Sequence, residues 1–529
     1  LRTGLTAMFP DPWGWIFARP FYLLTLKGRA PESLRNPPRD LWPGDPARGR
    51  RILDEGLAVT PDGDAAVTAL HDFGWLADVK AAGRPGAAER ARQLASDWIA
   101  ANQRWCPASW RADVLGQRLA NWFLCGDFLL AGADDGFRAR FLATIVAQAT
   151  HLARVAGRGP GLSGRGRGRF LALKGLISAS LAVPGLEENM ERALRLLENE
   201  IASQVLADGG HASRSPAGQL AVLADLLEIR SALQGARWQV PTTLQGAIDR
   251  MTPLLRTFRH GDGRLALFNG SAEDENERVE RVLAEAGGRG RPVSNAPHTG
   301  FQRLSAGRTL VIADTGLPRF SGDYPAHAGT LAIEMSVGKK RLIVNCGSRP
   351  ESDPVWREML RATAAHSTIT VDDVHSSELV PGGGLGRRRA VNVRASRRED
   401  AGHVLIEASH DGYRDFNGLI HHRRLYLGAD GDDFRGEDRL IGPGSHAFAA
   451  RFHLHPEVQV SLIQGGEAAL LRPAGGKGWR FRATGGALAI EESVYFGDGS
   501  RRRSQQVVIA GTHRGGETTV KWRLQLETA

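Results

Sequence analysis

The spacing of apolar residues changes once along this chain, shortly before residue 300. Across 61–286, apolar side chains recur every three or four positions, and the run 190–205 keeps them on one helix face up to a Gly-Gly stop. From Gly300 onward they alternate with polar residues, as at 331–335, and glycine-rich turns separate the runs. Side chains return to the same face after about 3.6 residues in a helix and after two in a strand. The sequence therefore predicts helices first and an antiparallel sandwich after them.

This change of period divides the chain into two predicted domains. A helical domain covers 1–287, a β-sandwich domain covers 298–529, and the glycine- and arginine-rich stretch 287–297 is the predicted linker. With 529 residues, 42% of them hydrophobic, the chain can bury two sizeable cores. We expect the helices to form hairpins that build a toroid or a solenoid, and the fold class to be multidomain α+β.

Composition narrows the classes of partner. The net charge of +10 favours polyanions, which include nucleic acid, anionic lipid and acidic polysaccharide. No basic segment is interleaved with aromatic residues in the manner of nucleic-acid recognition motifs, so we expect no nucleic-acid partner. No apolar run is long enough for a membrane span. The three cysteines provide neither a disulfide framework nor a metal-type pair. We expect a periplasmic or cell-envelope protein, with the cytoplasm as the alternative.

Three polar side chains mark the ends of alternating apolar runs in the second domain. His327 precedes one run, Asn345 ends the next, and His366 precedes a third. If these runs are neighbouring strands, the three side chains meet at one sheet edge, as a metal site or an acid/base cluster. The alternative is that each histidine caps a strand and hydrogen-bonds to the backbone.

Several motifs around these residues resemble the heparinase II/III superfamily of polysaccharide lyases. That family shows His-Ala-Asp, then Val-Asp-x-Gly, then Arg-x-Thr-x-Ala-His-Asn-Thr, and an Asp-Gly-Gly-x-x-x-Arg-Ser-Pro turn in its helical domain. The corresponding segments here are His327-Ala328-Gly329, Val344-Asn345-Cys346-Gly347, Arg361-Ala362-Thr363-Ala364-Ala365-His366-Ser367-Thr368 and Asp208-Gly209-Gly210-His211-Ala212-Ser213-Arg214-Ser215-Pro216. The resemblance covers most of the chain and is closest between Gly300 and Pro456.

The resemblance implies an architecture and a cofactor. Members of the superfamily have an incomplete (α/α) toroid followed by an antiparallel β-sandwich, with the substrate cleft between them. In that comparison His327, Asn345 and His366 occupy the places of the His, Asp and His that bind a structural zinc ion. Asn345 is a neutral and therefore poorer ligand than the aspartate of the family, which weakens the expected zinc site.

The resemblance also implies a reaction and the residues that perform it. Lyases of this superfamily remove the C5 proton of a uronic acid and expel the glycosidic oxygen by β-elimination. The family's toroid tyrosine has no counterpart after Pro216, and its Asn-His pair is not recognisable. We therefore assign catalysis to Tyr324, His211 and Arg214. We assign substrate binding to a second set, namely Arg361, Trp105 and Trp110.

Three functions remain open at this point. The chain is a lyase for a uronic-acid polysaccharide, or an altered relative that binds or hydrolyses an acidic cell-envelope polysaccharide, or a nucleic-acid-binding helical scaffold. Only the net charge prompts the third. We predict the lyase, with an acidic polysaccharide as its substrate.

Overall fold

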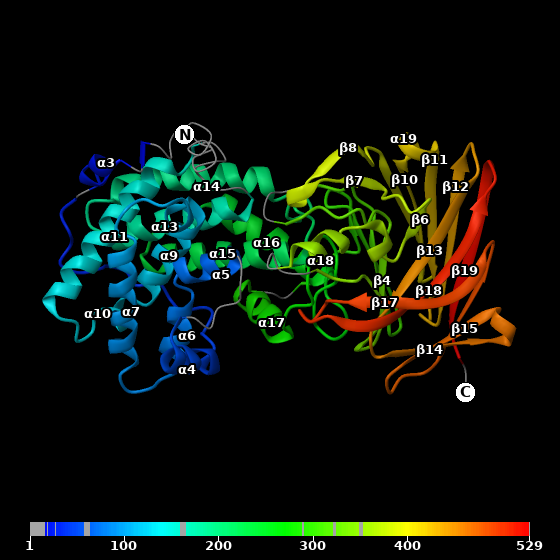
Figure 1. Ribbon diagram of the computed structural model, residues 1–529, viewed down its shortest axis with the longest axis horizontal. Helices are drawn as coiled ribbons and strands as arrows, with labels where there is room; N and C mark the ends of the chain where they lie inside the picture. The colour runs from blue at the N-terminus through cyan, green and yellow to red at the C-terminus, as the bar shows by residue number, and fades with distance from the viewer. Residues whose placement is uncertain are drawn as a thin grey trace, which may run out of the picture. The chain divides into compact units, whose positions relative to one another are not determined.

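Helices fill the described chain up to Glu285, and strands fill most of it from Asn295 onward (Figure 1). The computed structural model describes the residues 16–17, 19–26, 28–57, 64–158, 166–287, 290–320, 324–348 and 353–527. The predicted fold class is confirmed, with a helical region followed by antiparallel β-sheets. Within the part of the chain just given, no helix is long and apolar enough to cross a membrane.

The α-helices described in the first region have between 4 and 21 residues. They are α3 (Pro20–Leu24), α4 (Pro46–Glu55), α5 (Asp64–His71), α6 (Trp75–Ala81), α7 (Ala87–Ala101), α8 (Pro107–Trp110), α9 (Ala112–Leu124), α10 (Gly126–Leu130), α11 (Asp135–Val155), α13 (Arg167–Ala182), α14 (Met190–Gln204), α15 (Pro216–Gly235), α16 (Thr242–Thr257) and α17 (Asn276–Glu285). Helix α11 begins at an N-cap, because the side chain of Asp134 accepts a hydrogen bond from the backbone N–H of Phe137.

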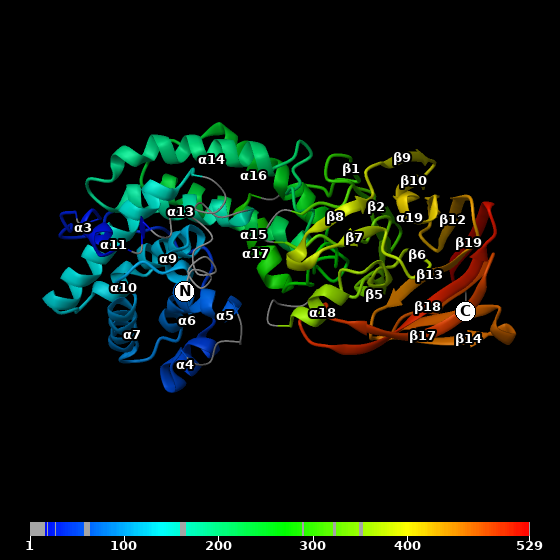
Figure 2. The ribbon, with the colours of Figure 1, turned by 45° about the horizontal axis from the view of Figure 1, so that its top comes forward.

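Two glycines let helices α9 and α13 approach more closely than other side chains would allow (Figure 1 and Figure 2). A Cβ atom added at Gly175 would lie 2.4 Å from the Cα of Gly116. Around this crossing, α9 buries Trp122 and α13 buries Phe170. The two backbones therefore touch directly, and the surrounding core is close-packed around them.

We expect Gly175→Ala to lower the free energy of unfolding of the helical unit by about 1–3 kcal/mol, because the added methyl group must push two backbones apart. Urea unfolding followed by circular dichroism measures the change. Gly235→Ala is the matched control, because a Cβ there meets no atom within 4 Å. An equal loss of stability in both variants would contradict the close helix approach.

The strands form two large antiparallel sheets. One sheet has the order β1-β2-β3-β4-β5-β13-β18-β17, with β6 paired to β13, and the other has the order β14-β15-β16-β19-β12-β11-β10-β9. The strands of the first are β1 (Asn295–Ala296), β2 (Phe301–Ala306), β3 (Thr309–Asp314), β4 (Ile333–Val337), β5 (Lys340–Val344), β6 (Ile369–Val371), β13 (His446–Leu454), β17 (Ala487–Tyr495) and β18 (Arg502–His513). Those of the second are β9 (Val393–Asp400), β10 (His403–Tyr413), β11 (Leu419–Leu427), β12 (Asp433–Gly442), β14 (Val458–Ile463), β15 (Ala468–Pro473), β16 (Trp479–Thr484) and β19 (Gly516–Leu526).

Smaller elements complete the β region. A two-stranded ribbon joins β7 (Ser377–Leu379) to β8 (Leu385–Arg389), and two short helices are α18 (Pro354–Met359) and α19 (Arg414–Asn417). The core of the sandwich combines inward side chains of both sheets, among them Ile343, Phe452, Ile406 and Trp522. The alternation of buried and exposed residues along β10 to β12 matches the alternation in the sequence.

The structural units do not follow the change from helix to strand. One unit contains Leu1–Ser203 and Ala224–Ile248, and the other contains Gln204–Leu223 and Asp249–Ala529. The turn after α14 therefore belongs with the sandwich. Its Asp208 accepts hydrogen bonds from the backbone N–H and the hydroxyl of Thr299. Within the predicted linker, β1 pairs with β2, so the described part of the linker adds a strand to the first sheet.

Candidate functional site

His327 and His366 meet in the interior of the β unit. The Nδ1 atom of His327 lies 3.1 Å from Nε2 of His366, and both side chains are buried. The Nδ1 atom of His366 lies 2.7 Å from the carbonyl oxygen of Ala362. A carbonyl can only accept, so this Nδ1 carries the proton, and Nε2 of His366 accepts from Nδ1–H of His327. The Nε2 atom of His327 is then an unprotonated acceptor, and it is buried without a hydrogen-bond partner.

Asn345 lies beside this pair, as the order of the strands predicts. Its Oδ1 accepts a hydrogen bond of 2.9 Å from the backbone N–H of Ser367, next to His366. Its Nδ2 donates to Oε1 of Glu334 at 3.0 Å. Glu334 is fully buried on β4 and also lies 2.9 Å from Nε2 of His260. The amide of Asn345 is therefore oriented by two partners.

The side chains at this position fit a zinc ion poorly. Nδ1 of His327 and Nε2 of His366 are hydrogen-bonded to each other, and the carbonyl oxygen of Asn345 already accepts from the backbone. No group of three or more His, Cys, Asp or Glu side chains that could hold a metal occurs among the described residues. Zinc binding by His327, Asn345 and His366 stays a prediction that rests on the resemblance.

Burial keeps the histidines of this region neutral. Desolvation lowers the pKa of His366 to about 4, and that of His453 to about 3. His327 has a pKa well below its usual value for the same reason, and the nearby His366 and Arg361 lower it further. An uncharged imidazole can both donate and accept a hydrogen bond, which is how His453 bridges the hydroxyl of Ser493 and the carbonyl of Ala364.

These shifts predict a loss of stability in mild acid. The folded pKa values of His366 and His453 lie below the unfolded value near 6.5, so the unfolded chain binds these two protons first. Stability is therefore fully present above pH ~6.5 and falls as the pH drops toward 4, by about 1.4 kcal/mol per pH unit for each histidine. Urea unfolding of the β unit at pH 7 and pH 5 measures this slope. His366→Gln should flatten it, and an unchanged slope in that variant would contradict the assignment to His366.

Arg214, one of the predicted catalytic residues, holds the turn after α14 against the first sheet. Its Nε donates to the carbonyl of Thr299 at 2.6 Å and Nη1 to the carbonyl of Leu317 at 2.8 Å, while Nη2 forms an ion pair with Asp314. Only 3% of Arg214 is exposed. Burial raises the pKa of Asp314, and the guanidinium opposes that rise. These contacts give Arg214 a structural role, and its part in catalysis stays a prediction.

His211 has a similar position in the same turn. Its Nδ1 lies 2.7 Å from the hydroxyl of Ser213, and its Nε2 lies 2.8 Å from Oε1 of Gln204. The backbone N–H of His211 donates to Gln219, at the start of α15. The imidazole is buried, and both ring nitrogens have partners within the turn.

Tyr324 is the catalytic candidate that keeps partial exposure to solvent. Its ring packs on the first turn of α15, because a Cβ atom at Gly218 would lie 3.0 Å from its Cε2 atom. The same added atom would lie 2.7 Å from the hydroxyl of Ser213, the partner of His211. The structure thus brings Tyr324 to the turn that contains His211 and Arg214.

The predicted substrate-binding residues differ in exposure. Arg361 is fully buried, where it donates to the carbonyls of Ala326 and Val380 and pairs with Glu358. A tryptophan that binds substrate has to lie near the surface, and this is therefore the expectation for Trp105 and Trp110. Trp105 is half-buried, but the expectation is wrong for Trp110, which is 3% exposed. The first turn of α9 follows it directly, and its ring packs edge-on against His151 in the core of the helical unit. Substrate binding by Arg361, Trp105 and Trp110 stays a prediction.

The sequence reasoning missed the pair of His260 and Glu334, which orients Asn345. A signal for it exists, because Glu334 lies within an apolar run, and the strand that this run forms is buried from Ile333 to Ser336. A carboxylate at such a position needs a buried partner. Its partner His260 is separated by 74 residues, and no spacing rule connects the two.

The first region and the β-sandwich both match known proteins. A family model described as Heparinase II/III-like, C-terminal, matches residues 288–523. FtsZ-localized protein C from Caulobacter vibrioides (strain NA1000 / CB15N) is 34% identical, and the alignment covers 93% of this chain and 90% of that protein.

Solved structures of lyases share the fold at low sequence identity. A crystal structure of heparinase III has a TM-score of 0.73 at 14% identity, with 98% of this chain and 92% of that chain covered. A mutant of the heparan sulfate lyase HepC from Pedobacter heparinus has a TM-score of 0.67 at 15% identity, covering 100% and 90%. The chondroitin AC lyase of Streptomyces coelicolor A3 has a TM-score of 0.54 at 11% identity, covering 97% and 80%. At these identities the likeness concerns the fold alone.

Proposed function

Since this chain belongs to the heparinase II/III-like family, we propose that it binds an acidic polysaccharide of the cell envelope and does not cleave it by β-elimination. Binding is the function that the geometry of Arg214 and His211 supports best. The net charge of +10 favours a polyanionic ligand. The structural relatives include a heparan sulfate lyase and a chondroitin lyase crystallised with chondroitin sulphate, and the names of these two proteins indicate acidic polysaccharides as their ligands.

The burial and hydrogen bonding of the two predicted catalytic residues Arg214 and His211 support this proposal. β-Elimination needs a cation or amide against the uronate carboxylate, a base at the C5 proton and an acid at the leaving oxygen. Arg214, which would neutralise the carboxylate, is buried and paired with Asp314. Both ring nitrogens of His211 are engaged with neighbours in the turn. To reach a sugar, either group would have to break these contacts.

The second candidate function is the lyase itself, and Tyr324 favours it. This tyrosine is partly exposed and packs beside the turn of His211 and Arg214. A phenol at that place could transfer the proton in both directions, as base and then as acid. In this alternative the carboxylate of the substrate would be neutralised by a group other than Arg214.

One experiment separates the two functions. The purified protein is incubated with a panel of uronic-acid polysaccharides, and the ultraviolet absorbance of unsaturated uronates is followed while binding is measured by affinity electrophoresis. Binding without unsaturated product is the expected result. Unsaturated product that Tyr324→Phe abolishes would establish the lyase, and product in the absence of any Tyr324 dependence would point to a different base. Absence of both binding and product would overturn the proposal.

The relative from Caulobacter vibrioides adds a proposal about location. Its name states that it localises with FtsZ, and 93% of this chain aligns with it. We extend this property to the present chain, which would then act where its own cell assembles FtsZ. A fluorescent fusion imaged together with labelled FtsZ tests this, and a uniform distribution would contradict it.

A further inference from the structure

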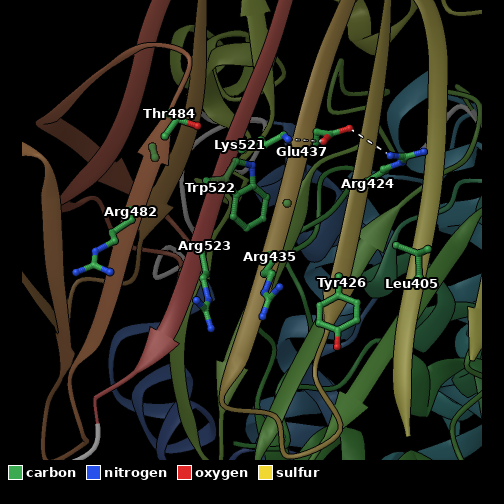
Figure 3. A pocket seen from close by; sticks show the side chains of 12 residues that line it. Leu405, Arg424, Tyr426, Arg435, Glu437, Arg482, Thr484, Lys521, Trp522 and Arg523 are labelled. Atoms are coloured by element: carbon green, nitrogen blue, oxygen red, sulfur yellow. Dashed lines mark hydrogen bonds and ion pairs between the residues drawn. The ribbon is translucent and has the colours of Figure 1, made fainter. Parts of the chain in front are cut away.

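The outer face of the second sheet carries a groove that lies apart from the candidate site described above. It crosses strands β10, β11, β12, β19 and β16 and has a volume of about 390 Å³ (Figure 3). Figure 3 shows arginine, lysine and tyrosine side chains standing on its floor. The groove lies entirely within the β unit.

The strand registers arrange these side chains in a transverse row. Arg482 is opposite Arg523, Arg523 is opposite Arg435, and Arg435 is opposite Tyr426, which is opposite Leu405. Side chains directly opposite each other on neighbouring strands share a face of the sheet. Three guanidinium groups therefore stand side by side, and a tyrosine ring and an aliphatic side chain continue the row.

A second row runs parallel to the first, two residues along each strand. Lys521 is opposite Glu437, and Glu437 is opposite Arg424. Glu437 lies 3.5 Å from Arg424 and 3.7 Å from Lys521. This row is more nearly balanced than the first.

The carboxylates around the groove do not match its cations. Asp433 pairs with both Arg523 and Arg435, so one carboxylate serves two guanidinium groups. Arg482 donates to the neutral Gln464 at 3.4 Å. Adjacent like charges on a sheet cost stability unless an anion lies between them. The first row is therefore an electropositive stripe of exposed side chains, since 52% of the Arg435 side chain and 40% of the Arg523 side chain are accessible.

We propose that this groove binds a chain of acidic polysaccharide laid across the strands. This inference rests on the proposed function and names the surface that performs it. Cations repeat along the row at the strand spacing of about 4.8 Å, which is close to the length of one sugar ring. Carboxylate or sulfate groups on successive sugars can thus reach Arg482, Arg523 and Arg435 in turn, and guanidinium groups bind such groups through paired hydrogen bonds.

The uncharged end of the row supports a sugar chain as the occupant. The ring of Tyr426 stacks on His403 at 5.7 Å between centroids, and its hydroxyl lies 2.8 Å from Nδ1 of that histidine. The guanidinium carbon of Arg435 lies 5.4 Å from the centre of the same ring. These contacts fix the ring as a platform, and an amphipathic ring of this kind packs on the apolar face of a sugar.

The test measures binding of a fluorescently labelled heparin oligosaccharide by anisotropy, with wild-type protein and the variants Arg435→Glu and Arg482→Glu. We expect each reversal to weaken binding about tenfold or more, because one charge-assisted contact is replaced by repulsion. Arg195→Glu is the matched control, because Arg195 is an exposed arginine with an exposed carboxylate neighbour, Glu191, in the helical unit. The control should bind as the wild type does, and thermal unfolding should confirm that all variants are folded.

The other possible results contradict either the groove as the binding site, the proposed function, or polysaccharide as the ligand. If the wild type binds heparin and both groove variants bind it equally well, the groove is not the site and the proposed function survives. If the wild type binds no acidic polysaccharide, both the groove and the proposed function fall. Equal affinity for single-stranded DNA of the same charge, or for vesicles of anionic lipid, would show a general anion surface and overturn the assignment to polysaccharide.

Discussion

Asp438→Asn is expected to lower the free energy of unfolding of the β unit by about 3–5 kcal/mol. Asp438 is buried on β12 and accepts from four donors: Nε2 of His421 at 2.7 Å, Nε and Nη2 of Arg423 at 2.6 and 3.0 Å, and the indole N–H of Trp522 at 3.0 Å. Burial alone would raise the pKa of this carboxyl, but Arg423 and His421 lower it well below its usual value. The amide of asparagine would leave Arg423 as a buried cation without a counter-ion.

The position of Arg423 makes the expected loss of stability in Asp438→Asn larger than the loss of one contact would. Its Nη1 donates to the carbonyls of Leu331 and Ser367, which belong to the connections beside His327 and His366. The guanidinium therefore joins the second sheet to the histidine region of the first. Guanidinium chloride unfolding monitored by tryptophan fluorescence measures the change. Glu457→Gln is the control, since Glu457 forms an exposed pair with Lys340, and such pairs contribute about 0–1 kcal/mol. Similar losses in the two variants would contradict the network.

The change of apolar period was sufficient to predict the order of the two structural classes. The spacing of apolar residues is a local property of the sequence, and it determines which face of a helix or strand is buried. The alternation of buried residues along β10 shows this. The division into units was harder, because Asp208 bonds to Thr299 across 91 residues. Contacts of this kind attach the turn after α14 to the sandwich, and no local pattern in the sequence records them.

In the candidate site, too, contacts between residues far apart in the sequence decide what a local motif cannot. The motif residues His327, Asn345 and His366 were predicted to come together, and they do, because β4 pairs with β5, while β5 and β6 both pair with β13. The roles of Arg214 and Arg361 could not be predicted from the motifs. A motif gives the type of a side chain, but exposure and pairing decide whether a guanidinium meets substrate or backbone carbonyls, and those depend on distant residues such as Asp314.

Arg214→Ala is expected to destabilise the β unit by about 3–5 kcal/mol, because it leaves Asp314 as a buried carboxylate without its cation. The carbonyls of Thr299 and Leu317 would lose their donors as well. Since burial raises the pKa of Asp314 and Arg214 opposes that rise, the variant should take up a proton on this carboxyl. The destabilisation should accordingly be larger at neutral pH than in mild acid, where the wild type also approaches protonation.

A double variant isolates the ion pair from the rest of the site. Arg214→Met combined with Asp314→Leu removes both charges, so it should be more stable than either single change. Arg214→Lys keeps the charge but not the planar fork, and should fall between the wild type and Arg214→Ala. Urea unfolding at pH 7 of the wild type, the single variants Arg214→Met and Asp314→Leu, and the double variant gives the coupling free energy. If Arg214→Ala instead unfolds at the wild-type urea concentration and loses an activity that the wild type shows on a uronic-acid polysaccharide, Arg214 acts on substrate, and the lyase replaces the binding protein as the function of this chain.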